Sequence, residues 1–194
     1  MMSKADNNSV RIDLPDWIAG VEQQLPASLE TAEQRMSVAI SLAEQNLRHG
    51  TGGPFGALVV AVGSGAVIAL GVNRVEPQLC SAAHAEIVAL SLAQRRMGHW
   101  NLSETPHGPL QLVTSCEPCA MCLGAIPWSG VTSVLCGATK ADAEAAGFDE
   151  GARSSRWVEE LDRRGVDVRT GVLREQAARV LERYARQGNT IYNP

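Results

Sequence analysis

Two apolar runs joined by a glycine-rich turn place the strongest constraint on the fold of this chain. Residues 56–62 and 66–72 are almost entirely apolar, and Gly63, Ser64 and Gly65 separate them. Short apolar runs on either side of such a turn are typical of a β-hairpin. Neither run alternates apolar with polar side chains, so we expect both faces of the sheet to be covered.

Helices that can cover both faces are predicted along the rest of the chain. Apolar residues repeat at helical spacing from about Leu29 to His49. Further helices are predicted over 83–97, 119–128, 140–146, 154–164 and 173–184, and short strands over 110–114, 131–136 and 166–169. A hairpin followed by alternating helices and strands predicts an α/β fold, a three-layer α/β/α sandwich around a mixed sheet of about five strands.

The chain length of 194 residues favours a single domain. We interpret residues 1–27 as an N-terminal extension with a short helix near Trp17, residues 28–188 as the domain, and residues 189–194 as a tail. No apolar stretch reaches the roughly 18 residues of a membrane span. The N-terminus also lacks the pattern of a secretory signal. We therefore expect a cytoplasmic protein without a membrane partner.

Cysteine content and charge narrow the class of function. Five cysteines are present, and Cys116, Cys119 and Cys122 lie within seven positions. In a cytosolic chain, an odd count with such a cluster indicates metal binding or catalysis before disulfides. Seventeen basic and 21 acidic residues give a net charge of -4, which disfavours a nucleic-acid partner. Arginines between Arg153 and Arg169 alternate with acids, and we interpret them as a solvated face.

Two short fragments carry the predicted chemistry, and each stands at the start of a predicted helix. They are His84-Ala85-Glu86 and Pro118-Cys119-Ala120-Met121-Cys122. Zinc prefers nitrogen and sulfur ligands, and a catalytic zinc site leaves one position open for water. Cysteines three apart share a helix face, and the helix N-terminus favours their thiolate form. The sequence therefore predicts one zinc ion per chain, held by His84, Cys119 and Cys122.

The spacing of Glu86 predicts a proton carrier rather than a ligand. It stands two positions after His84, so it can take a proton from a zinc-activated water and pass it to a substrate. H-x-E followed by P-C-x-x-C is the signature of zinc deaminases. The alternative is a closed structural zinc site with Cys116 as a fourth ligand.

A longer string around these cysteines resembles a known family. Residues 114–125 read TSCEPCAMCLGA, and the match extends over GPFGA at 53–57, Asn73-Arg74 and AGFDE at 146–150. The chain resembles the cytidine-deaminase-like zinc deaminase superfamily, and within it the bacterial guanine deaminases. Adenosine deaminases acting on transfer RNA share the E-P-C-x-M-C core. The resemblance covers about residues 29–150 and the tail, and residues 1–27 have no counterpart.

This resemblance implies roles for individual residues. His84, Cys119 and Cys122 match the zinc ligands, and Glu86 matches the catalytic acid/base. Glu150 stands where the family can carry an aspartate that reads the amidine edge of guanine, and here it is one methylene longer. Matches to substrate-binding positions are Asn73, the backbone at Ala85, the aromatic walls Phe55 and Trp128, Ser115 beside the pocket, and Tyr192 of the tail.

The function implied is the hydrolysis of free guanine to xanthine and ammonia. Glu86 then moves the protons, and Glu150 either binds guanine N–H groups or serves as a second proton relay. The family also implies a homodimer with exchanged tails, in which Tyr192 closes the partner's pocket. Open alternatives are deamination of another small base, nucleoside or triazine, deamination of transfer RNA adenosine, and a zinc-binding module without activity.

Overall fold

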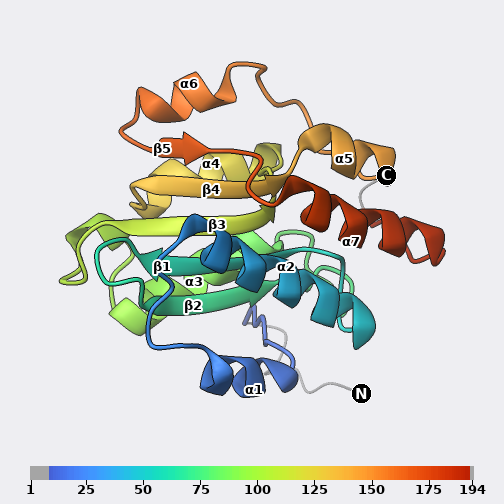
Figure 1. The fold of residues 1–194 in the computed structure, drawn as a ribbon, viewed down its shortest axis with the longest axis horizontal. Coiled ribbons are helices and arrows are strands. Elements are labelled where there is room, and N and C mark those ends of the chain that lie inside the picture. The colour runs from blue at the N-terminus through green and yellow to red at the C-terminus, as the bar shows by residue number, and fades with distance from the viewer. Residues whose placement is uncertain (1–8, 193–194) are drawn as a thin grey trace.

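One mixed sheet of five strands separates two layers of helices (Figure 1). The computed structural model describes residues 9–192. The strands are β1 (Gly56–Ala61), β2 (Val67–Val72), β3 (Leu110–Cys116), β4 (Ser133–Ala138) and β5 (Asp167–Arg169), in the order β2-β1-β3-β4-β5. β1 is antiparallel to β2 and β3, whereas β3, β4 and β5 are parallel. The predicted fold class is therefore confirmed.

The helices follow the predicted order with small differences at their ends. They are α1 (Trp17–Gln24), α2 (Ala32–Arg48), α3 (Ala85–Met97), η2 (Leu102–Glu104), α4 (Ala120–Ser129), α5 (Lys140–Ala145), α6 (Trp157–Asp162) and α7 (Arg174–Arg186). α2 begins later than predicted because Thr31 caps it, accepting from Gln34 N while the Gln34 side chain accepts from Thr31 N.

Two apolar clusters fill the space on either side of the sheet. One lies under α2 and α7 and also includes Ile18 of α1 and Phe148. The other lies under α3, α4 and α6 and includes Ile126, Trp157 and Leu161. β1 is buried along its whole length because both clusters press on it. The absence of alternation in the apolar runs is thus explained.

Glycines let two helices approach the hairpin very closely. A Cβ atom on Gly56 would lie 2.4 Å from the carbonyl oxygen of Ala39 in α2, and one on Gly71 would lie 2.3 Å from that of Ala85 in α3. Neither distance is sterically possible, so glycine is required at both positions. The contact at Gly71 holds the first turn of α3, and with it His84 and Glu86, against the sheet.

The functional fragments lie together at the end of the sheet where β2 and β3 terminate and β1 begins. Gly56 pairs with Val72 and Ala57 with Thr114, so Phe55, Asn73 and Ser115 all emerge at this end. His84 and Cys119 are the N-cap residues of α3 and α4, which begin beside it. Two helix N-termini therefore converge on one place.

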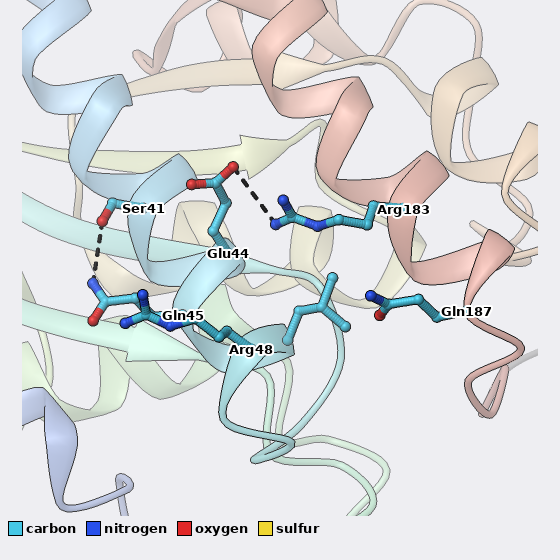
Figure 2. A pocket seen from close by; sticks show the side chains of 7 residues that line it. Ser41, Glu44, Gln45, Arg48, Arg183 and Gln187 are labelled. Carbon is cyan, nitrogen blue, oxygen red and sulfur yellow. Dashed lines mark hydrogen bonds and ion pairs between the residues drawn. The ribbon is translucent and has the colours of Figure 1, made fainter.

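A larger hollow lies elsewhere, in a polar groove between α2 and α7 (Figure 2). Its volume is about 810 Å³, and an ion pair of 3.6 Å between Glu44 and Arg183 crosses it. None of the residues that line it belongs to the two fragments. Within residues 9–192, no helix is both long and apolar enough to cross a membrane.

Candidate active site

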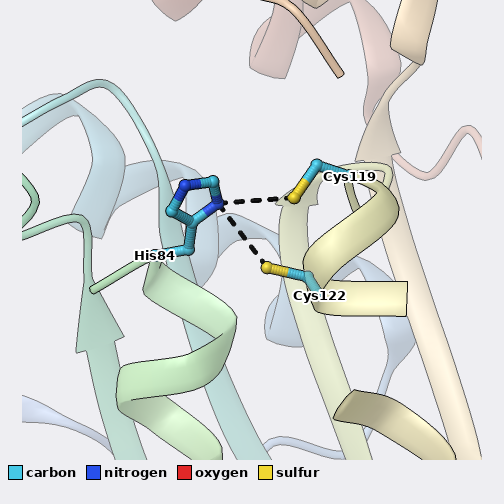
Figure 3. Close-up of side chains that lie close together, drawn as sticks. All are labelled: His84, Cys119 and Cys122. Carbon is cyan, nitrogen blue, oxygen red and sulfur yellow. Dashed lines mark hydrogen bonds between the residues drawn. The ribbon is translucent and has the colours of Figure 1, made fainter. Parts of the chain in front are cut away.

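The structure brings the three predicted metal ligands together (Figure 3). His84 Nδ1 lies 3.5 Å from Cys119 Sγ and 3.6 Å from Cys122 Sγ. Zinc bonds of about 2.0–2.1 Å to nitrogen and 2.3 Å to sulfur, at tetrahedral angles, place the two atoms roughly 3.6 Å apart. The donor set and its spacing therefore fit one zinc ion.

The two cysteines hold unequal charge in a way that suits metal binding. Hydrogen bonds from the Cys122 thiol and from His84 lower the pKa of Cys119 to about 4. The same hydrogen bond to Cys119, together with burial, raises the pKa of Cys122 well above its usual range. One thiolate is thus already present, and metal binding displaces the proton of the other.

Cys116 lies outside this group, which contradicts the alternative of a fourth sulfur ligand. It is buried, and its thiol donates to the carbonyl oxygen of Thr139 at 3.7 Å. Burial raises the pKa of this thiol well above its usual range, so it stays neutral. A position for a fourth ligand that is not sulfur is consistent with a catalytic rather than a structural zinc site.

A small cavity beside the ligands collects most of the other predicted residues. Its volume is about 10 Å³. The residues that line it are Phe55, Asn73, His84, Glu86, Glu117, Cys119, Glu150 and Tyr192. Such a cavity holds about one water molecule and no purine, so a base can enter only when a lining side chain moves.

Two buried carboxyl groups face this cavity. Glu86 is 6% exposed and Glu150 is 4% exposed. Burial, followed by the negative charge of Cys119, raises the pKa of Glu86 and raises that of Glu150 to about 8. Glu150 can therefore carry a proton at neutral pH, and the raised pKa of Glu86 favours its proton-holding form, which suits acid/base catalysis. The positive charge of a cation held by the three ligands lowers the pKa of both carboxyl groups and so opposes these effects.

The loop that carries Glu150 is fixed to the start of α4. The carbonyl oxygen of Glu150 accepts from the N–H of Ala120 at 3.0 Å. The next residue, Gly151, has a φ of 70°, and the side chain of Asp149 accepts from its N–H. These contacts hold Glu150 next to Cys119, although the two residues are far apart in the sequence.

Asn73 and Phe55 lie at the cavity as predicted. Asn73 is 1% exposed, and its Oδ1 accepts from the N–H groups of Gly53 and Val75. With its oxygen engaged in this way, Asn73 presents its amide N–H₂ to the cavity. Phe55 packs edge-on against Phe148, with ring centroids 4.9 Å apart. Ala85 is fully buried as the first residue of α3 and is not part of the cavity lining.

Two of the predicted substrate-binding residues, Trp128 and Ser115, do not line this cavity in the single chain. Trp128 is 78% exposed, on the outer face of α4, and lines a surface hollow against α6 rather than the cavity. Ser115 is buried, and its hydroxyl accepts from the N–H of Gly56 at 3.1 Å. Ser115 therefore joins β1 to β3 and is not part of the cavity lining.

Tyr192 of the tail lies in the cavity of its own chain. Its ring is 6.4 Å from that of His84 and 5.4 Å from that of Phe148. Within residues 9–192, its Oη is the one buried side-chain nitrogen or oxygen without a hydrogen-bond partner. Tyr184, which donates to the carbonyl oxygen of Thr190, anchors the tail after α7. Residues 193–194 of the predicted tail lie outside the described residues.

Sequence reasoning missed two residues of the site, Glu117 and Arg153. Glu117 lines the cavity, and its carboxylate accepts from Arg153 at 2.7 Å and from the N–H of Lys140 at 3.0 Å. The Arg153 side chain is only 6% exposed, and its guanidinium lies 4.7 Å from the ring centroid of Trp157. The interpretation of Arg153 as part of a solvated face is therefore wrong.

Comparison with known proteins places these features in a family context. Residues 29–138 match the family model described as the cytidine and deoxycytidylate deaminase zinc-binding region. A solved structure of a guanine deaminase from Nitrosomonas europaea is 44% identical, covers 93% of this chain and 98% of its own, and superposes with a TM-score of 0.87. Another solved structure, in complex with 2,6-diaminopurine, is 45% identical over 96% and 98% of the two chains, with a TM-score of 0.89.

Curated relatives include both base and RNA deaminases. The guanine deaminase of Bacillus subtilis is 43% identical over 58% of this chain and 67% of its own. A tRNA-specific adenosine deaminase of Streptococcus pyogenes is 30% identical over 84% of this chain and 96% of its own. Identity is thus higher to the guanine deaminases.

Proposed function

The chain belongs to the cytidine and deoxycytidylate deaminase zinc-binding family and is a zinc-dependent hydrolytic deaminase, and we propose that its substrate is free guanine. One observation carries this proposal. The cavity beside the metal ligands, which His84 and Cys119 help to line, is also lined by the buried carboxyl groups of Glu86 and Glu150 and by the amide of Asn73. These are the groups that a base with several N–H donors and a carbonyl acceptor requires.

Each residue of the cavity has a part in the proposed reaction. Zinc, when held by His84, Cys119 and Cys122, lowers the pKa of a coordinated water from 15.7 to about 7 and so supplies a nucleophile at neutral pH. Glu86 accepts one proton of the water and delivers it to the ring nitrogen as the hydroxide adds to the carbon. It then takes the remaining hydroxyl proton of the adduct and passes it to the amino group, which leaves as ammonia while the carbonyl forms. Its raised pKa suits a group that must both take and give a proton.

Recognition of guanine rests on matched donors and acceptors. In its ionised form Glu150 accepts from N–H groups of the base, and Asn73 donates to an acceptor such as the carbonyl oxygen. Phe55 supplies an aromatic wall. Because a buried group without a partner costs about 1–3 kcal/mol, a base that presents an acceptor to Glu150 is rejected.

Deamination of transfer RNA adenosine is less consistent with the site. Tyr192 covers the cavity, and an RNA loop has to displace the whole tail. Arg153 is engaged with Glu117 rather than free for phosphate. The decisive experiment measures ammonia release from guanine, adenine, cytosine, cytidine, a triazine and a transfer RNA anticodon stem-loop. Guanine alone is the expected substrate, and a preference for the stem-loop refutes the proposal.

We also propose that the protein is a cytoplasmic homodimer. Residues 9–192 contain five free cysteines and no disulfide, which is typical of a reducing compartment. α4 has no charged residue, yet Met121 and Trp128 are exposed on it. A helix that is apolar on all sides is normally buried on all sides. In the proposed dimer, a second copy of the chain packs against the exposed face of α4. We further propose that the two copies exchange their C-terminal tails, so that Tyr192 of each copy closes the cavity of the other.

A further inference from the structure

The N-terminal segment, which contains α1, contacts the loop that precedes β1. Trp17 of α1 stacks on His49, with ring centroids 5.5 Å apart and an angle of 18° between the rings. The indole Nε1 donates to Thr51 Oγ1 at 3.1 Å. Thr51 follows the end of α2 and begins the loop that leads to Gly53 and Phe55 at the cavity.

A chain of hydrogen bonds with a fixed direction runs from this contact towards the cavity. An indole N–H is a donor only, so Thr51 Oγ1 must accept from Trp17. Its own proton then goes to Asn46 Oδ1 at 2.8 Å. With its oxygen accepting, Asn46 directs both amide protons to carbonyl oxygens, that of Gly53 at 2.8 Å and that of Asn73 at 2.9 Å.

This series of hydrogen bonds ends at Asn73, which lines the cavity where the base binds. Asn46 is completely buried, so every one of its hydrogen-bonding positions must be filled. Gly53 is held from both sides, since its oxygen accepts from Asn46 and its N–H donates to Asn73 Oδ1. The same contacts fix the amide orientation of Asn73, with N–H₂ towards the cavity.

A second contact ties the N-terminal segment to the same loop. Arg74, which is 8% exposed, donates from Nε to the carbonyl oxygen of Asp13 at 3.0 Å and from Nη1 to the carbonyl oxygen of Thr51. Two independent contacts from residues 13–17 therefore converge on Thr51. Ile18, buried in the core under α2, holds α1 in place.

We propose that the N-terminal segment is a positioning element of the base-binding site, and that Trp17 acts through Thr51 and Asn46 to fix Asn73 and Gly53. Neither Trp17 nor Thr51 touches a substrate or the metal ligands. Their effect is on binding of the base, and not on the proton transfers at Glu86. This inference rests on the proposed function for the identity of the base.

Trp17→Phe tests the proposal without removing the helix. Phenylalanine keeps an aromatic ring against His49 but lacks the N–H donor. Thr51→Val keeps the shape of the threonine and lacks the hydroxyl. We expect each variant to raise KM for guanine about three- to ten-fold, the range of one lost hydrogen bond, with kcat within about two-fold. The double variant should be no worse than either single one, because both break one chain.

A matched control comes from the other side of the same helix. Glu22→Gln removes an exposed ion pair of 2.7 Å between α1 and Arg96 of α3, which does not involve the loop. This variant should keep the wild-type KM. If it raises KM as much as Trp17→Phe does, or if Trp17→Phe and Thr51→Val leave KM unchanged, the proposal is wrong.

Amide hydrogen exchange provides a second measurement that needs no activity. The N–H groups of Gly53 and Val75 both donate to Asn73 Oδ1, and they should exchange faster in Trp17→Phe and Thr51→Val. Unchanged exchange overturns the positioning role. A wild-type protein inactive on guanine refutes the proposed function, and the exchange result still decides whether the N-terminal segment positions Asn73.

Discussion

The carboxylate of Glu117 and the guanidinium of Arg153 form an ion pair of 2.7 Å between the segment before Cys119 and the segment after Glu150. Arg153 also donates to the carbonyl oxygen of Pro118 at 3.0 Å. One side chain thus joins the loop of a metal ligand to the loop of a substrate-facing carboxylate. Both side chains are largely buried, so water cannot replace either partner of the pair.

We expect Arg153→Gln to lower the free energy of unfolding by about 3–5 kcal/mol, because it leaves the buried Glu117 carboxylate without a counterion. Urea denaturation of the zinc-loaded protein measures this. Arg163→Gln is the control, since its pair with Glu159 is exposed and the change should stay within about 0.5 kcal/mol. Equal stability of the two variants contradicts the structural role given to Arg153.

Metal analysis should find one zinc ion per chain with one nitrogen and two sulfur ligands. Cys119→Ser and Cys122→Ser should each lose most of the metal, whereas Cys116→Ser should keep it, because Cys116 lies outside the ligand group. X-ray absorption at the zinc edge measures the ligand set. A third sulfur, or loss of zinc from Cys116→Ser, refutes the catalytic interpretation of the site.

Glu86→Gln should retain zinc and lower kcat by about 10²–10⁴-fold, the usual contribution of a general acid/base. The amide has nearly the same shape, so binding of guanine should change little. Steady-state kinetics with a parallel zinc assay separates the two effects. Turnover close to that of the wild type means that another group moves the protons.

Stability at acid pH should depend on Asp142. Arg174 and the capping contacts with Thr139 lower the pKa of this carboxyl below its usual range. A carboxyl with a lowered pKa in the folded state stabilises it above the unfolded pKa of about 3.9, and the effect is lost as pH falls. Asp142→Asn should therefore be less stable than wild type at pH 7. The difference should shrink below about pH 4, as thermal unfolding across pH can show. A difference that is constant with pH contradicts the assignment.

Truncation after Gly188 should leave the fold and zinc content intact and greatly reduce deamination, since Tyr192 then no longer closes the cavity over a bound base and excludes water from it. Circular dichroism and zinc content serve as controls. Full activity without the tail refutes its role as a lid.

Mixing tailless chains with Glu86→Gln chains distinguishes a tail that serves its own chain from an exchanged one. With exchange, mixed dimers pair an intact Glu86 with the other chain's tail, and activity returns. The structure shows the tail on its own chain, so failure of this rescue, or a monomer at working concentration, leaves only that arrangement.

Features carried by local patterns were predicted well. The hairpin, the helices and the two ligand fragments each depend on residues close in sequence, which is why His84 in one fragment and Cys119 and Cys122 in the other could be predicted. Features that depend on packing were not. Arg153 stands among exposed arginines and acids, and its burial follows from Glu117 and Trp157, which no local pattern connects to it.

The exposure of Trp128 in the single chain follows from its position on α4. The buried positions of α4 are Cys122, Ile126 and Ser129, a stripe at helical spacing, and Trp128 lies off that stripe. Its aromatic character favoured a pocket role, whereas its helical phase indicated the outer face. The hydroxyl of Ser115 accepts from a backbone N–H of the neighbouring strand, and sequence does not reveal that pairing.

The tight fit of the tyrosine ring over a cavity of about 10 Å³ also concerns the end of the catalytic cycle. Xanthine is as large as guanine and cannot leave past a ring in that position. Every turnover then contains two displacements of the tail, one for admission and one for release. We expect the opening of the chain end to limit the maximal rate, and solvent viscosity to lower that rate even where the bond-breaking steps are fast.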